Sequence, residues 1–226
     1  MTNQIRVLST IGMRTVVEEL APAFEQAHGC TVTRVYDSSV ALMKRIAGGE
    51  SGDAAIFTAG AIDDLTAQGK VSARTDLTRS FVGIAVRTGA AKPDISTSEA
   101  FKRALIAAKS IARSKTGASG LYLAGLIDRL GLGDALGPKM IVQDGIVGKI
   151  AARGEAEIAV QQISELMQAE GIDIVGPLPD ELQSVTVFSA GVFTSAANAE
   201  LARAYVADLA SPAHAELIRR KGMEPI

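Results

Sequence analysis

The first 68 residues repeat one pattern three times: a short apolar strand, a turn of small or hydroxyl side chains, and an amphipathic helix. The predicted strands are residues 5–9, 31–36 and 53–57, and the predicted helices are residues 15–27, 40–46 and 61–68. Strands joined in this way through helices favour a parallel sheet. The turns after parallel strands lie together at one edge of the sheet, where ligands of such folds bind.

Strands and helices continue to alternate in the rest of the chain, up to Ser189. The predicted strands are 80–86, 110–113, 140–142, 157–161, 172–175 and 185–189, and the predicted helices are 98–108, 121–130, 145–153, 162–167, 196–209 and 212–221. The last two helices have no sheet of their own, so we expect them to pack on the first lobe. The middle of the chain is then an inserted lobe, and an insertion requires two crossings of the chain.

The pattern therefore predicts an α/β fold of two lobes, each a mainly parallel sheet flanked by helices, with a ligand cleft between the lobes. The predicted parts are residues 1–82 with 188–226 for lobe 1, residues 88–180 for lobe 2, and residues 83–87 and 181–187 for the hinge crossings. A single continuous sheet would argue against this division.

A polar, glycine-rich stretch at residues 111–120 precedes the predicted helix 121–130. A helix N-terminus presents unpaired N–H groups and a partial positive charge, which together attract an anion. Small residues let a ligand approach the backbone, and hydroxyl groups add donors. The alternative is an ordinary capped loop, with Ser114 or Thr116 as the N-cap residue.

Composition excludes several classes of function. The net charge is −2, no basic block exists and aromatic residues are 4%, so binding to nucleic acid through a basic, stacking surface is not expected. The single cysteine, Cys30, excludes an internal disulfide, and His28 and His214 lack partners at metal-ligand spacing. No cofactor and no metal are predicted.

The location of the protein depends on how the chain begins. No apolar run is long enough to span a membrane, and no signal peptide is present in the chain as written. We expect a cytoplasmic protein on this basis, or a periplasmic one if a leader was removed. A monomer without membrane insertion is expected in either case.

Several stretches of the sequence match a known family. They are residues 7–13 (VLSTIGM), 18–24 (EELAPAF), 38–42 (SSVAL), 53–57 (DAAIF), 154–157 (GEAE) and 221–225 (KGMEP). On these stretches the chain resembles, over essentially its whole length, the molybdate-binding type of periplasmic substrate-binding proteins, which have the type II binding-protein fold. A subgroup that includes aconitate isomerases also shares residues 114–120 (SKTGASG), 161–165 (QQISE) and 175–179 (VGPLP).

The resemblance implies that uncharged donors, hydroxyl and backbone N–H groups from two turns in each lobe, bind a tetrahedral oxyanion. Ser39 matches a family serine that holds this anion. The predicted ligand-binding residues are Thr10, Ile11, Gly12, Met13, Ser38, Ser39, Thr58, Ser114, Lys115, Gly117, Ala118, Ser119, Ile146, Val147 and Gln162.

Two departures from the family pattern affect the expected ligand. Gly12 stands where molybdate binders have a serine, and near Gln162 those proteins place a tyrosine that contacts the anion. Two hydroxyl donors are thus absent, and each bond to a charged group contributes ~1.5–3 kcal/mol. We expect the glycine to leave room for a larger ligand and the amide to suit a carboxylate. Lys115 and Arg14 would pair with further carboxylates, unless both are solvated surface charges.

The sequence therefore predicts a substrate-binding protein that captures a small di- or tricarboxylate, or an oxyanion, for an ABC transporter. The alternative is a cis–trans isomerase of aconitate on the same scaffold, and a ligand sensor is a third possibility. The isomerase would need a base at the bound substrate. Glu165, Asp37 and Lys115 are candidates for that base, and their spacing singles out none of them.

Overall fold

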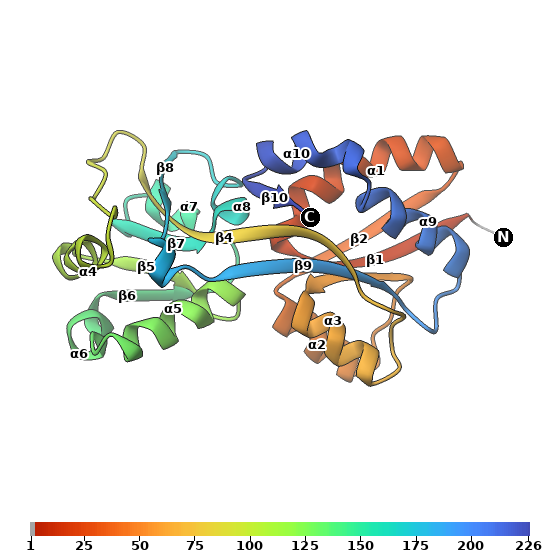
Figure 1. Cartoon of the computed structure of the whole chain (residues 1–226), viewed down its shortest axis with the longest axis horizontal. Coiled ribbons are helices and arrows are strands. Elements are labelled where there is room, and N and C mark those ends of the chain that lie inside the picture. The colour runs from red at the N-terminus through yellow and green to blue at the C-terminus, as the bar shows by residue number, and fades with distance from the viewer. Residues whose placement is uncertain (1–2) are drawn as a thin grey trace. The chain divides into compact units, whose positions relative to one another are not determined.

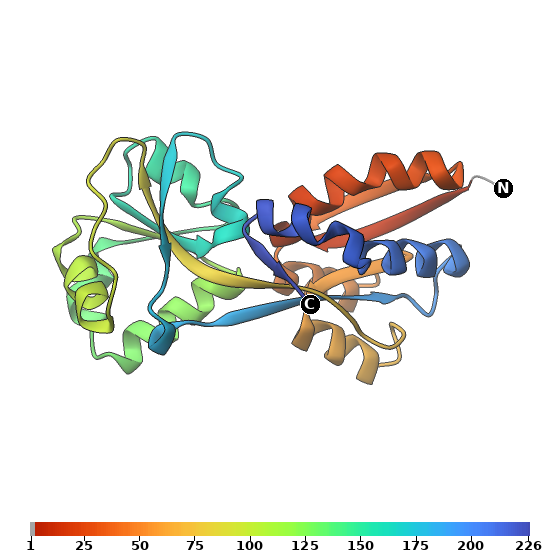
Figure 2. The same ribbon diagram turned by 45° about the horizontal axis from the view of Figure 1, so that its top comes forward.

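The computed structural model describes residues 3–226 (Figures 1 and 2). The chain forms two compact units: unit 1 consists of the chain up to Arg79 together with Thr186–Ile226, and unit 2 of Ser80–Val185. The strands are β1 Gln4–Thr10, β2 Thr31–Asp37, β3 Ala54–Thr58, β4 Thr75–Arg87, β5 Ile111–Ser114, β6 Met140–Gln143, β7 Ile158–Gln162, β8 Ile172–Pro177, β9 Val185–Val192 and β10 Met223–Pro225.

The helices lie between these strands and, in unit 1, also follow β9. They are α1 Arg14–His28, α2 Ser39–Ala47, α3 Ala59–Ala67, α4 Ser98–Ala107, α5 Ala118–Arg129, α6 Gly133–Leu136, α7 Gly148–Ala152, α8 Ile163–Leu166, α9 Ala199–Leu209 and α10 Ala215–Arg220. Short 3-10 turns occupy η1 Ile11–Met13, η2 Gly137–Lys139, η3 Asp180–Leu182 and η4 Pro212–His214.

Unit 1 is a sheet covered by helices on both faces. Strand β1 lies between β2 and β3 and is parallel to both, and β9 is antiparallel to β3. Side chains of β3 alternate between two cores because successive residues of a strand point to opposite faces. Ile56 packs with α1, α9 and α10, whereas Phe57 packs with α2 and α3. The last two helices therefore cover the first sheet, as their lack of a following sheet predicts.

Unit 2 has the same construction. Strand β5 is parallel to β6 and β7, and β4 is antiparallel to β7 and β8. Val160 of β7 packs with α4 and α5 on one face, and Ala159 packs with α7 and α8 on the other. The α/β class is confirmed in both units. In each unit, the strands at the centre are parallel and their neighbours are antiparallel.

Strand β4 belongs to both units. The strands follow one hydrogen-bonded order, β2-β1-β3-β9-β4-β7-β5-β6, rather than forming two separate sheets. The single sheet named above as an argument against two lobes is therefore present, and the division into two units rests instead on the contacts within each unit. The single sheet results from the length of β4, which has 13 residues: the part before Ser80 lies in unit 1, and Val82–Arg87 pair with β7 and β8 in unit 2. The sequence predicted only the second half of this strand, because the first half is polar and alternates less clearly.

Several predicted helices differ from the observed ones at their N-termini, among them α5, α7 and α9. Helix α5 begins at Ala118, three residues before the prediction, so Ser119 lies inside its first turn. Helix α7 begins only at Gly148, because Gly145 adopts a left-handed φ of 85° that ends regular structure there. Helix α9 begins at Ala199, where the Asn198 side chain caps it.

Candidate functional site

The predicted residues of unit 1 lie at the carboxyl ends of its parallel strands. Thr10 ends β1, Ser38 and Ser39 follow β2, and Thr58 ends β3. The register places Thr10 beside Asp37 at the end of β2, so the turns after neighbouring strands lie at one edge of the sheet. Ile11, Gly12 and Met13 form the 3-10 turn that joins β1 to α1.

Adjacent serines after β2 have different roles. The Oγ of Ser38 accepts the Ala41 N–H at 3.1 Å and thereby caps α2. The Oγ of Ser39 instead accepts the Thr58 N–H at 3.2 Å, which ties the turn after β2 to the turn after β3. Because the Ser39 oxygen accepts in this bond, its hydroxyl hydrogen is the group that can be donated to a ligand.

Gly12 does not leave room for a larger ligand, and that expectation is wrong. A Cβ at this position would lie 2.5 Å from Cζ of Phe188, whose ring belongs to the core of unit 1. The space of a missing side chain is therefore filled by a phenylalanine of β9. Packing against Phe188 accounts for the glycine, and ligand size no longer follows from it.

Arg14 is exposed at the start of α1, beside the turn. Its guanidinium carbon lies 5.0 Å from the centre of the Tyr36 ring, at the end of β2, in a cation–π contact. The charge is thus held near the carboxyl ends of β1 and β2.

In unit 2, the stretch singled out from the sequence joins β5 to α5. Gly117 is the N-cap residue, and the Oγ of Ser114 accepts its N–H at 2.8 Å, so Ser114 organises the turn without being the N-cap residue itself. Thr116 donates instead to Asp144 at 2.7 Å.

Position 120 requires a glycine, because a Cβ there would lie 1.9 Å from the Ser114 carbonyl oxygen. Lys115 is exposed beside the turn, and so is Ala118, the first residue of the helix.

Ser119 is the second residue of α5 and is fully buried. Its Oγ has no hydrogen-bond partner among residues 3–226, so it does not act as a cap. A buried hydroxyl without a partner is costly, and such groups in native proteins commonly have a functional reason. Its position in the first turn, where backbone N–H groups lack helical partners, suits an anionic ligand.

The turn from Gly145 to Val147 follows β6, beside the turn after β5, and includes half-buried Ile146. The Gln161 side chain in β7 binds this turn at two points: its Oε1 accepts the Val147 N–H at 2.9 Å and its Nε2 donates to the Gly145 carbonyl at 2.8 Å. The Val147 N–H is therefore engaged by the protein. Gln162 was predicted from the sequence as a ligand-binding residue and Gln161 was not, although two adjacent amides at the end of an otherwise apolar strand were a usable signal.

Gln162 ends β7, is buried, and is the N-cap residue of α8. Glu165, in the first turn of α8, is buried as well, and burial raises the pKa of its carboxyl to about 7. Hydrogen bonds from the Gln162 backbone and the Gln161 side chain partly oppose this rise. Of the other base candidates, Asp37 accepts the Ser38 N–H at 2.7 Å, and Lys115 is exposed.

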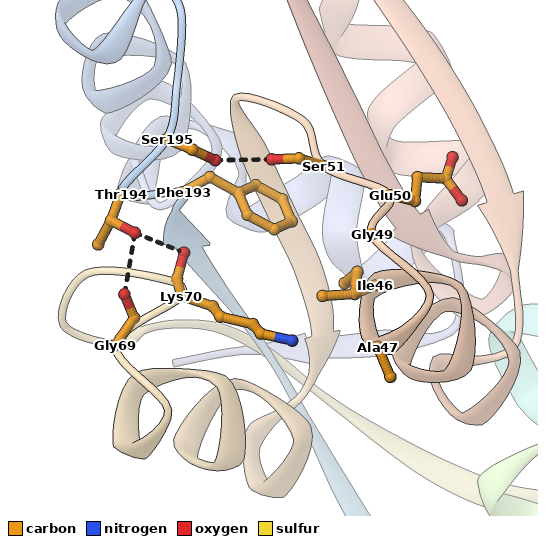
Figure 3. Close-up of a pocket in the computed structure, with 10 residues that line it drawn as sticks. All are labelled: Ile46, Ala47, Gly49, Glu50, Ser51, Gly69, Lys70, Phe193, Thr194 and Ser195. Atoms are coloured by element: carbon orange, nitrogen blue, oxygen red, sulfur yellow. Dashed lines mark hydrogen bonds between the residues drawn. The ribbon is translucent and has the colours of Figure 1, made fainter.

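A separate hollow of about 360 Å³ lies elsewhere in unit 1 (Figure 3). It is bordered by the C-terminal ends of α2 and α3 and by the segment before β3, so it faces the amino ends of the parallel strands. Lys70 extends into it, below Phe193 in the view of Figure 3, and a hydrogen bond of 2.7 Å joins Ser51 to Ser195. None of the predicted ligand-binding residues lines this hollow.

Two properties of residues 3–226 concern the kind of site that the chain can hold. No helix in this part of the chain is long and apolar enough to cross a membrane. The same residues contain no group of three or more histidine, cysteine or acidic side chains placed to hold a metal ion. Donors gathered after parallel strands are therefore the feature that the two units share.

The chain belongs to the family of bacterial extracellular solute-binding proteins, whose family model matches residues 5–224. It is 38% identical to a protein named aconitate isomerase from a Pseudomonas species, over 98% of this chain and 88% of that protein. It is 22% identical to the molybdate-binding protein ModA of Escherichia coli K12, over 97% of this chain and 88% of ModA.

Solved structures agree with this family. The periplasmic molybdate-binding protein of Azotobacter vinelandii superposes with a TM-score of 0.80 at 19% identity, over 97% of this chain and 98% of that one. The sulfate-binding protein SubI of Mycobacterium tuberculosis superposes with a TM-score of 0.77 at 16% identity, over 100% of this chain and 88% of that one. The resemblance drawn from the sequence, and the type of fold it implies, are thus confirmed.

Proposed function

We propose that the protein binds a small di- or tricarboxylate through donors at the carboxyl ends of β1, β2 and β3 in unit 1 and of β5, β6 and β7 in unit 2. The observation that carries this proposal is Ser119, whose buried hydroxyl has no partner in the described chain and lies in the first turn of α5. Ser39 is its counterpart in unit 1, and we propose that each of the two serines donates to a bound ligand. The other predicted ligand-binding residues stay part of this proposal, except Val147, whose N–H is bound by Gln161.

Carboxylate is favoured over a metal oxyanion by the amide of Gln162. An amide offers a donor and an acceptor, which suits a carboxyl group, whereas an oxyanion such as molybdate uses donors alone. The relative at 38% identity is named for a tricarboxylate substrate, which supports the same class. Exposed Arg14 and Lys115, beside the turns of their units, supply positive charge for additional carboxylates.

A solute-binding protein that captures such a carboxylate would act as the receptor of a transporter. Its partner would be the membrane subunits of an ABC transporter, and it would act as a monomer. The ligand is captured without chemical change, so only binding groups are needed at the site.

The second candidate is cis–trans isomerisation of aconitate, which the named relative and Glu165 favour. This reaction removes a proton from the substrate and returns it through an allylic carbanion, so it needs a base that titrates near neutral pH. Among the three candidates from the sequence, Glu165 has this property, because its burial raises the pKa to about 7.

Calorimetry with cis-aconitate, trans-aconitate, citrate, molybdate and tungstate tests the ligand class. We expect binding of at least one carboxylate and weak or no binding of the two oxyanions. Tight binding of molybdate alone would refute the proposal. Incubation of the protein with cis-aconitate, followed by NMR, then separates a receptor from an isomerase, since only an isomerase produces the trans form.

A further inference from the structure

The buried polar side chains at the end of β7 form one connected network. Gln161 is 1% exposed and bonds both ends of the Gly145–Val147 turn. The same side chain is hydrogen-bonded to the Glu165 carboxyl, which also accepts the backbone N–H of Gln162. The turn after β6 and the first turn of α8 are therefore held together through one amide.

Glu165 has the position of a helix-capping carboxylate, but an incomplete set of partners. It is the third residue of α8 and its bond to the N-cap residue Gln162 is that of a capping box. One of its oxygens, Oε2, is buried and has no hydrogen-bond partner among residues 3–226. An ionised carboxylate normally has both oxygens hydrogen-bonded when it is buried, so this site is better suited to the neutral acid.

Among residues 3–226, no cation compensates a charge on Glu165. Neither α8 nor β7 has another charged residue, and only burial and two hydrogen bonds act on the carboxyl. On the neighbouring elements, Asp173 of β8 accepts the Gly89 N–H, Lys149 of α7 is exposed, and Asp144 after β6 accepts from Thr116. An anion bound at the Gly145–Val147 turn would thus meet an uncompensated like charge if Glu165 were ionised.

We propose that Glu165 takes up a proton when the anion binds, and that Gln161 is the positioning residue that connects this carboxyl to the anion-binding turn. The inference rests on the proposed function. The proton comes from solvent and stays on the Glu165 carboxyl, so no bond of the ligand changes. Binding is then linked to pH: affinity is highest where Glu165 is already protonated and falls as the pH rises past the point where it ionises.

The test is calorimetry of the full chain with trans-aconitate between about pH 6 and pH 9, where carboxyl groups of the probe are ionised. For the natural sequence we expect the dissociation constant to rise about tenfold per pH unit above the ionisation of Glu165. Glu165→Gln keeps the side-chain size and cannot ionise, so its dissociation constant should not depend on pH in this range. Glu170→Gln, which removes an exposed carboxylate five residues further on, is the matched control and should behave like the natural sequence.

A second measurement needs no variant. Binding heats in two buffers of different ionisation enthalpy count the protons taken up, and near pH 8 we expect about one per ligand. Zero uptake with measurable binding, or an unchanged pH slope in Glu165→Gln, would overturn the inference while the proposed function stands. If neither trans-aconitate nor another carboxylate binds at any pH, the proposed function fails and the linkage with it.

Discussion

At the scale of single residues, the two serines Ser39 and Ser119 differ in a way that mutation can separate. Ser119 Oγ has no partner among residues 3–226, whereas Ser39 Oγ accepts the Thr58 N–H. Removing the first hydroxyl therefore loses no intramolecular bond, and removing the second loses one. If both donate to the ligand, both substitutions weaken binding, but only one destabilises the fold.

We expect Ser119→Ala to leave stability unchanged or slightly increased and to lower ligand affinity by about 10- to 150-fold, the effect of ~1.5–3 kcal/mol. Ser39→Ala should lower affinity similarly and also cost about 1 kcal/mol of stability. Calorimetry and urea unfolding measure the two effects. Thr97→Ala, which removes the cap of α4, is the control that should lose stability alone. Parent-like affinity in both serine variants would place the ligand elsewhere.

The pH dependence of stability is a second residue-scale property, and it follows from Glu165. The folded-state pKa is raised from 4.5 to about 7 by burial, so the folded protein binds this proton more tightly than the unfolded chain. The stabilisation that comes from this tighter proton binding is fully present below the unfolded-state pKa. It is lost as the pH rises through the folded-state pKa. Glu165→Gln removes this titration.

Between about pH 4.5 and pH 8, we therefore expect the natural sequence to lose up to about 3 kcal/mol of stability relative to Glu165→Gln. Urea unfolding at the two ends of this range, with each protein compared to itself, measures the difference. Parallel stability curves for the two proteins would show that Glu165 titrates normally in the folded state.

At the scale of elements, the turn between β6 and α7 depends on β7, the strand that follows α7. Gln161 supplies the turn with an acceptor and a donor, and both bonds are buried or half-buried. The Ile146 and Val147 carbonyls accept N–H groups from α7, whereas the Val147 N–H and the Gly145 carbonyl are bound by the Gln161 side chain.

Gln161→Met keeps the side-chain volume and removes both bonds. We expect it to cost ~1–3 kcal/mol of stability, because the Val147 N–H stays buried without a partner, and to lower ligand affinity about tenfold. Gln168→Met is the control, because it removes a half-buried amide that donates to the Ser164 carbonyl rather than to the turn. An affinity equal to that of the parent would mean that the turn takes no part in binding.

At the scale of the whole molecule, ligand binding should stabilise the folded chain as a unit. A ligand present at about 100 times its dissociation constant adds ~2.7 kcal/mol, which corresponds to about 5–10 °C in Tm for a chain of this length. We expect this shift with trans-aconitate or citrate and not with molybdate at the same concentration. Ser39→Ala and Ser119→Ala should each reduce this shift, and an unchanged shift in either variant would remove that serine from the proposed site.

The amino-acid sequence alone determined the α/β class, the order of most strands and helices, and the family. These follow from local pattern: apolar alternation identifies strands, the helical period identifies helices, and the stretches after each strand resemble those of solute-binding proteins. The same local reasoning placed Ser114 to Gly120 at the start of a helix, although one turn of that helix was missed.

Only the tertiary structure decided what each of these residues contacts. Gly12 suggested an open space until Phe188, distant in the sequence, proved to fill it. Gln161, rather than the neighbouring Gln162, binds the Gly145–Val147 turn, and burial alone distinguishes Glu165 from Asp37 as a candidate proton carrier. Contacts and solvent exposure arise from packing between distant segments, and a sequence pattern describes only the faces that are available to pack.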